Sequence, residues 1–299
     1  MSALDLLGLG SVAVDELLHV DAFPAPDTKL RVTHRERRCG GLTGVALLAA
    51  ARLGARCGYA GRLGFDPASG FVEKALAQAG IDTQRAPRAD GQRVVESTIV
   101  VATDTGTRNV FSHSPGNTGA HDTLPAADAI RAARVLLIDH HGIPGSIRAA
   151  AIARAAGGAV LGDFERDEDP RFRELLALVD HLILSESFAR RVTGAVSPAD
   201  AATRLWSPDR QLVIVTCGGD GCWFTDGGHV QHVPAFEVAV IDTTSCGDVF
   251  HGAYATALAS GMEIAARVRF ASAAAALKAA RRSAEPLPTR AEVETLLRG

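Results

Sequence analysis

The sequence is poor in aromatic residues and in lysine, and each shortage limits the kinds of core or of binding partner that the chain can have. Aromatic residues make up 5% of the 299 residues, so a core must be built mainly from Ala, Val, Leu and Ile. Lysine occurs only as Lys29, Lys74 and Lys278, and the remaining positive charge comes from arginines scattered along the chain. The net charge of −3 gives no general attraction for nucleic acid or anionic membranes, so we expect neither as a partner.

Cysteine pairs and long apolar runs are also missing. The five cysteines form neither a CxxC motif nor a paired Cys/His pattern, which argues against a zinc site and predicts reduced thiols. Residues 1–10 contain Asp5 and no basic segment, unlike a signal peptide. The longest uncharged apolar stretch, residues 41–51, is too short to span a bilayer. We therefore expect a soluble, cytoplasmic protein.

Short apolar runs alternate with helical segments through the middle of the chain. The runs cover residues 135–139, 159–163, 181–185 and 212–216. Continuous apolar strands separated by helices are typical of a parallel sheet that is buried on both faces. Helical periodicity also marks residues 42–53, 69–79, 248–259 and 263–280. The sequence thus predicts an α/β fold with a doubly wound, mostly parallel sheet.

Two further stretches, at about 14–38 and 92–113, alternate like strands and contain turn-forming residues. They are far apart in sequence and could pair in space as a small β-sheet. Parallel α/β bodies bind ligands at the carboxyl ends of their strands, where a small tethered sheet would serve as a lid. We expect residues 1–299 to form a single domain with this lid, and its exposed edge would favour a homodimer through the lid.

The strongest local signal lies at residues 241–253, where small and hydroxyl-bearing residues precede an acidic residue that opens a helix. Unpaired N–H groups and the helix dipole attract an anion there. The small side chains of Ser245, Cys246 and Gly247 would let a phosphate approach those groups. Asp248 then has two interpretations: the common one of a helix cap, or a base that takes a proton from an alcohol attacking the phosphate.

Residues 242–248 (DTTSCGD) resemble the DTxGxGD signature of the ribokinase/PfkB family of carbohydrate kinases. Residues 215–221 are similar to the family's VTxGxxG stretch, residues 39–41 to its double-glycine motif, and residues 61–66 to its GxxGxDxxG motif. The motifs occur in the family's order over essentially the whole chain. The resemblance implies a ribokinase-like fold and ATP-dependent phosphorylation of a hydroxyl group on a small sugar or sugar derivative, with ATP and Mg²⁺ as cofactors.

The resemblance also implies roles for individual residues. Asp248 would be the catalytic base, and the amides of Ser245, Cys246 and Gly247 would form the anion hole. The implied substrate-binding residues are Asp15, Gly40, Gly41, Gly44, Arg108 and His141. The implied nucleotide-binding residues are Glu186, Thr216, Gly218 and Gly221. Asp242 and Thr244, with Ser283 and Ala284, stand where many relatives bind a monovalent cation such as K⁺.

The chain departs from the family pattern at three places. Ser245-Cys246 replaces Gly-Ala in the anion hole. The Asn that usually follows the double glycine is missing, and Gly44 occupies that neighbourhood, which removes one hydrogen bond expected to the sugar. The NxxE motif, linked to Mg²⁺ and phosphate, reads Ser-Glu-Ser-Phe at 185–188, which leaves Glu186 to supply a carboxylate.

Residues 185–194, 231–236 and 248–253 resemble the branch that contains sulfofructose kinase. A sulfonate prefers an Arg partner. Where that branch places Arg, this chain has His140-His141, and Arg108 could compensate. The substrate therefore stays open among a ketose, a sulfosugar and a sugar acid. A nucleoside kinase of the adenosine-kinase type and a catalytically silent sugar- or nucleotide-binding protein are the alternatives.

Other classes fit less well. Gly8-Leu9-Gly10 lacks the third glycine of a dinucleotide-binding fingerprint, and no Gly-Lys-Ser/Thr of a P-loop occurs. Asp139-His140-His141 suggests a metal site, but adjacent histidines on a strand are expected to point to opposite faces.

Overall fold

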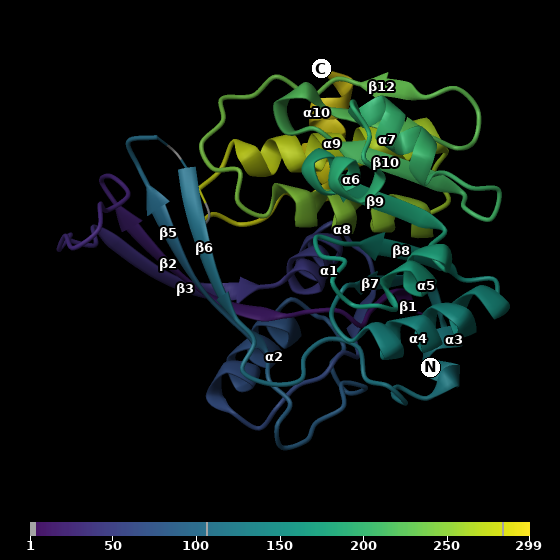
Figure 1. The fold of residues 1–299 in the computed structure, drawn as a ribbon, viewed down its shortest axis with the longest axis horizontal. Coiled ribbons are helices and arrows are strands. Elements are labelled where there is room, and N and C mark those ends of the chain that lie inside the picture. The colour runs from purple at the N-terminus through teal and green to yellow at the C-terminus, as the bar shows by residue number, and fades with distance from the viewer. Residues whose placement is uncertain (1–3, 106, 283) are drawn as a thin grey trace.

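A large sheet forms the centre of the computed structural model, which describes residues 4–105, 107–282 and 284–299 (Figure 1). In this part of the chain the sheet has eight strands in the order β12-β11-β10-β9-β8-β7-β1-β4. The strands from β10 to β4 run parallel, and β11 and β12 continue antiparallel. Their bounds are β1 Leu4–Gly8, β4 Cys57–Tyr59, β7 Ala133–Asp139, β8 Ala159–Asp163, β9 His181–Ser185, β10 Leu212–Thr216, β11 Cys222–Thr225 and β12 Gln231–Val233.

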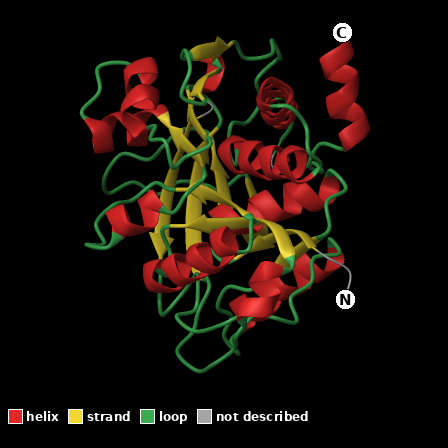
Figure 2. Ribbon diagram, turned by 90° about the vertical axis from the view of Figure 1, so that its right-hand side faces the viewer, coloured by secondary structure: helices red, strands yellow, loops and turns green. Residues whose placement is uncertain are grey.

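Helices cover both faces of this sheet, as the turned view in Figure 2 shows. One face packs against α1 (Leu42–Arg52), α2 (Pro67–Gln78), α8 (Cys246–Ala259), α9 (Ile264–Ala279) and α10 (Arg290–Arg298). The other packs against α3 (Ala127–Arg131), α4 (Ile143–Ala155), α5 (Phe172–Ala177), α6 (Glu186–Thr193) and α7 (Pro198–Leu205).

Successive residues of one strand belong to opposite cores. In β7, Val135 and Leu137 pack in one core, whereas Leu136 and Ile138 pack in the other. This double burial explains why the runs are continuously apolar rather than alternating.

Close helix packing compensates for the shortage of aromatic residues. Helices α1, α8 and α9 are rich in alanine, and α8 packs against both α1 and α9. A Cβ atom at Gly252 of α8 would overlap the Ala46 carbonyl of α1, so the two backbones approach as closely as the absence of a side chain allows. The small residues therefore fill this core by letting the helix backbones approach closely, rather than by the volume of their side chains.

A second, four-stranded sheet projects from the body beside α2, at the left of Figure 1. Its strands are β2 (Ala13–Val20), β3 (His34–Gly40), β5 (Val95–Ala102) and β6 (Thr107–His113), in the order β3-β2-β5-β6. Strands β2 and β5 pair in parallel, which joins the two distant segments of the chain. Residues 21–33 form no strand, and Gly106, in the expected turn between β5 and β6, lies outside the described residues.

The predicted fold class is confirmed: a mostly parallel sheet covered on both faces, with a separate small sheet. None of the helices within residues 4–105, 107–282 and 284–299 combines the length and the apolar character that a membrane-spanning helix needs. All five cysteines are free.

Candidate functional site

Two cavities lie at the carboxyl edge of the parallel strands and share the segment 243–248. We call the first the small-sheet cleft, a cavity of about 210 Å³. Its walls include Asp15, Gly41, Ser97, Arg108, His140, His141, Arg166, Thr244, Ser245 and Asp248. We call the second the α9 cleft, a cavity of about 300 Å³. Its walls include Arg108, Thr216, Gly218, Gly221, Phe236, Thr243, Cys246, Gly247, Ser272 and Ala276.

The start of α8 offers an anion site between the two cavities. Ser245 is the N-cap residue, with φ +63° and ψ 13°, and makes no side-chain cap. Within the described chain, the N–H groups of Gly247 and Asp248 meet no acceptor. A Cβ atom at Gly247 would meet nothing within 4 Å, so this turn faces open space. Free N–H groups at a helix start with open space before them suit a phosphate.

Asp248 is the third residue of α8, half-buried, and faces the small-sheet cleft. The helix begins two residues earlier, so Asp248 does not occupy the cap position. Burial raises the pKa of Asp248 well above its usual value, and the nearby carboxyl groups of Asp163 and Glu165 raise it further, while His251 and the Ser245 hydroxyl act in the opposite direction. A carboxyl with a raised pKa in a cleft is a good proton acceptor.

His251 is buried next to the start of α8 and contacts its first turn. The sequence reasoning did not assign this histidine a role. His251 Nδ1 lies 2.8 Å from the Gly247 carbonyl oxygen and 3.3 Å from Asp163 Oδ2. Its Nε2 lies 3.1 Å from the Ile183 carbonyl oxygen on β9. Burial lowers the pKa of His251, and the two carbonyl hydrogen bonds oppose that effect. His251 thus fixes the peptide group between Gly247 and Asp248.

Asp139 ties three parts of the cleft wall together. It is fully buried at the end of β7 and accepts hydrogen bonds from Ser11 N at 2.6 Å, Ser11 Oγ at 2.9 Å, Thr43 Oγ1 at 3.0 Å and His141 N at 2.8 Å. Strand β7 ends at Asp139, so strand alternation does not extend to the histidines. The expectation that they point to opposite faces is therefore wrong: both His140 and His141 line the small-sheet cleft, with ring centroids 4.4 Å apart. Burial lowers the pKa of His140 to about 4.

Asp15 and Gly41 line the small-sheet cleft, whereas Gly40 does not reach its wall. Asp15 is buried on β2, where burial raises its pKa while Arg38 and Ser97 lower it. Gly40 packs against the Asp15 carboxylate, and a Cβ atom there would overlap it. Gly41 lines the cleft with φ +85°, and a Cβ atom would lie 2.7 Å from Val12 Cα, so only glycine fits without strain.

Gly44 does not reach the cavity wall: it is the third residue of α1 and lies against Val12. The absence of a side chain there leaves no polar group for a ligand.

Two arginines come to the cleft from different elements. Arg108 of β6 lines both cavities, and its Nη1 donates a hydrogen bond to Thr243 Oγ1 at 3.0 Å. Arg166 follows β8 and lines the small-sheet cleft. The sequence reasoning missed Arg166, although its place just after an expected strand end could have indicated it.

The α9 cleft lies between the end of β10 and an apolar face of α9. Thr216, Gly218 and Gly221 come from β10 and the 3₁₀ turn η1 (Gly218–Asp220), opposite Ala275, Ala276 and Ala279. Small apolar residues facing a glycine-rich turn leave room for a flat ring, as expected of a nucleotide site.

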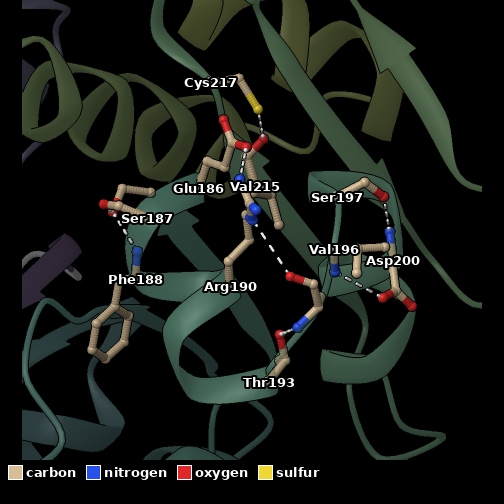
Figure 3. A network of polar contacts seen from close by, with 12 residues as sticks. Glu186, Ser187, Phe188, Arg190, Thr193, Val196, Ser197, Asp200, Val215 and Cys217 are labelled. Carbon is tan, nitrogen blue, oxygen red and sulfur yellow. Dashed lines mark hydrogen bonds and ion pairs between the residues drawn. The ribbon is translucent and has the colours of Figure 1, made fainter.

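Glu186 is not part of that wall. It begins α6, and its carboxylate pairs with Arg190 at 3.2 Å, as Figure 3 shows. The Cys217 thiol is its neighbour. Burial raises the pKa of Cys217 to about 11, and Glu186 contributes to the shift.

Asp242 lies behind the segment 243–248, outside both cavity walls. Its Oδ1 accepts a hydrogen bond from Thr244 N at 2.8 Å, and its Oδ2 is 3.7 Å from Lys278 Nζ. Thr244 lines the small-sheet cleft. Of the other two expected cation ligands, Ala284 is exposed and Ser283 lies outside the described residues.

An anion-binding helix start between two cavities, with a carboxylate beside it, is the arrangement of a phosphotransferase. The family model for pfkB family carbohydrate kinase matches residues 4–290. The ribokinase of Staphylococcus aureus is 30% identical over 260 residues, which cover 84% of each chain. Fructokinase-1 of Zea mays is 26% identical over 293 residues, 86% of this chain and 88% of that one.

The structure of Arabidopsis thaliana ribokinase complexed with ribose and ATP superposes with a TM-score of 0.85 at 22% identity, over 99% of each chain, which supports the fold. The chain belongs to the pfkB family of carbohydrate kinases and is an ATP-dependent sugar kinase of the ribokinase/fructokinase type.

Proposed function

We propose that the acceptor hydroxyl belongs to a ketose, sulfosugar or sugar acid bound in the small-sheet cleft, and that Asp248 is its catalytic base. One observation carries the proposal: Asp248 lines this cleft, while the two residues before it, Cys246 and Gly247, line the α9 cleft. An acceptor on one side and a phosphate on the other would then meet at the start of α8, as transfer between them requires.

ATP occupies the α9 cleft in this proposal, with its base between η1 and α9 and its phosphates at the start of α8. Of the expected anion hole, the Cys246 N–H already donates to the Thr243 carbonyl oxygen at 3.3 Å. The free amides of Gly247 and Asp248 therefore stabilise the charge on the transferring group, and Arg108 reaches it from the small sheet. Asp248 takes the proton of the attacking hydroxyl. Closure of the small sheet as a lid excludes water, which favours transfer to the sugar over hydrolysis of ATP.

The residues present suit a Mg²⁺ ion that arrives with the nucleotide. No group of three or more His, Cys, Asp or Glu side chains in the described ranges is placed to hold a metal. Mg²⁺ commonly keeps several waters and binds through phosphates and one or two carboxylates, and it neutralises phosphate charge. Glu186, one residue after the carboxyl end of β9, is the carboxylate we propose to assist.

The cleft chemistry favours a substrate that carries an anionic group. The guanidinium groups of Arg108 and Arg166 both line the cavity, and neither forms an ion pair with another described residue. Arginine binds carboxylates and sulfonates through its paired N–H groups. A sugar acid or sulfosugar therefore uses both walls of the cleft, whereas a neutral ketose uses mainly Asp15 and the serine hydroxyls.

We further propose that residues 1–299 work as a single domain and that two copies associate through their small sheets. The edge strand β6 is exposed along its length, and Phe111 on it is 57% exposed. An exposed strand edge with an apolar side chain is a natural pairing surface.

The experiment that tests the function is ADP release from ATP·Mg²⁺ across a panel of ketoses, sulfosugars, sugar acids and nucleosides. We expect turnover on one sugar-type compound, with the acids and sulfosugars ahead of neutral ketoses. Turnover on a nucleoside would instead establish the nucleoside kinase. Binding of ATP or sugar without turnover on any compound would identify a silent binding protein.

A further inference from the structure

Lys278 is a charged residue in an unusual, buried position. It lies in the last turn of α9 with 2% of its surface exposed. Buried lysines are rare unless they are paired. The chain uses arginine almost everywhere, with Lys29 and Lys74 as its other lysines, so a lysine at a buried position indicates a need for a compact ammonium group rather than a planar guanidinium.

The ammonium group faces one residue in particular. Lys278 Nζ is 3.4 Å from the carbonyl oxygen of Asp242 and 3.7 Å from its carboxylate Oδ2. Burial lowers the pKa of Lys278, while the charge of Asp242 raises it. The neighbouring Ala279 carbonyl accepts the N–H groups of Ile241 and Asp242 at 2.8 and 3.1 Å. The end of α9 thus holds the segment that leads to the start of α8.

That segment carries the anion site. Asp242 Oδ1 accepts the Thr244 N–H, and Ser245 follows in its left-handed conformation before α8 begins. A charge that fixes Asp242 therefore fixes the path of residues 242–245. It also adds positive potential behind the N–H groups that would face a phosphate.

The expected monovalent cation does not fit this arrangement. A K⁺ ion at the expected site would need the Asp242 carboxylate, but the Oδ2 atom of that carboxylate and the Asp242 carbonyl oxygen already face the Lys278 ammonium. A second cation beside an ammonium group would be repelled at short range.

We propose that Lys278 is a built-in monovalent cation, so that this kinase works without K⁺. Lys278 is a positioning residue: it acts through Asp242 on the segment 242–245 and touches neither substrate. The inference rests on the proposed role of the α8 start in phosphoryl transfer.

The test compares native protein and Lys278→Ala in K⁺, Na⁺ and tetramethylammonium salts at equal ionic strength. We expect native turnover to be the same in all three. Lys278→Ala should lose about 100-fold in tetramethylammonium, as for catalytic groups displaced by about 1 Å, and K⁺ or NH₄⁺ should restore much of it. Lys278→Met fills the space without charge and should lose activity with no rescue. Lys74→Ala, at an exposed lysine of α2, is the control for loss of charge.

Thermal unfolding gives a readout that needs no turnover. Potassium at about ten times its Kd should raise the Tm of Lys278→Ala by about 3 °C and leave that of the native protein unchanged. If Lys278→Ala does not fold, Asp242→Asn/Lys278→Ala, which removes both charges, should fold and show no potassium effect.

Activation of the native enzyme by K⁺, or full activity of Lys278→Ala in tetramethylammonium, would overturn the inference. A protein that turns over no compound, yet shows this Tm pattern, would contradict the proposed function and leave the cation inference standing.

Discussion

Replacing Asp248 by asparagine keeps the shape and polarity of the side chain and removes its ability to accept a proton. A positioned general base contributes about 10²- to 10⁴-fold to a rate, which corresponds to about 3–5 kcal/mol of transition-state stabilisation. We therefore expect kcat of Asp248→Asn to fall within that range. The KM for ATP should change little, because the α9 cleft does not include Asp248. Asp128→Asn, at an exposed side chain of α3, is the matched control.

The raised pKa of Asp248 also predicts how activity and thermal stability change with pH. The base works when it is deprotonated, so kcat/KM should rise with pH through a pKa above the value of about 4 for an ordinary aspartate. A carboxyl whose pKa is raised by folding stabilises the native state below its unfolded pKa, and this contribution is lost as pH rises through the folded pKa. Asp248→Asn should therefore melt at a higher temperature than the native protein at pH 8.

These expectations separate a base from a structural carboxylate. The Tm difference should shrink near pH 4, where Asp248 of the native protein is itself protonated. Steady-state ADP release and thermal unfolding at several pH values measure both effects. An Asp248→Asn protein with turnover within tenfold of native would refute the base, whatever its Tm. A lower Tm at pH 8 would refute the view that charge on this carboxylate is unfavourable in the fold.

Two further predictions concern the double glycine and the small sheet. Gly41→Ala should cost about 1–3 kcal/mol of stability and raise the KM for the sugar, because Gly41 has a φ of +85° and an added Cβ atom would meet Val12. Gly157→Ala is the control. Gly157 has a similar φ of +78° and a Cβ atom there would meet nothing within 4 Å, so this variant measures the backbone strain alone. Sedimentation should show a native dimer that Phe111→Ser weakens; a native protein that stays monomeric at high concentration would exclude the lid interface.

The sheet was predictable because its signal is local. Residues 135–139 read as a buried strand from five consecutive positions, and the structure has β7 over Ala133–Asp139. The histidines after it were misplaced for a related reason: the end of a strand depends on contacts made by Asp139, with Ser11 and Thr43 far away in the chain. Periodicity carries no information about such contacts.

The residues of the site also fall into two groups: those that a local sequence pattern indicates and those that only the folded structure brings into place. Asp248 and the residues before it form a local pattern with a chemical meaning, so the sequence alone could indicate them. Arg166 and Lys278 gain their positions from the folded sheet and from the packing of α9, which no spacing in the sequence encodes. Lys278 is 36 residues from Asp242, and the hydrogen bonds between the end of α9 and residues 241–242 bring them together. Long-range ion pairs of this kind require the three-dimensional structure.

Ser245 shows how a departure from a family pattern can have its own physical reason. Its left-handed conformation, with φ +63°, costs a non-glycine residue about 1–2 kcal/mol, and glycine would avoid that cost. The Ser245 hydroxyl, however, acts on the Asp248 carboxylate and lowers its pKa. Burial and two neighbouring carboxyl groups raise that pKa strongly, so a donor at this position limits the rise and keeps more of Asp248 deprotonated. A glycine would relax the backbone and remove that donor from Asp248, the carboxylate that lines the small-sheet cleft from α8.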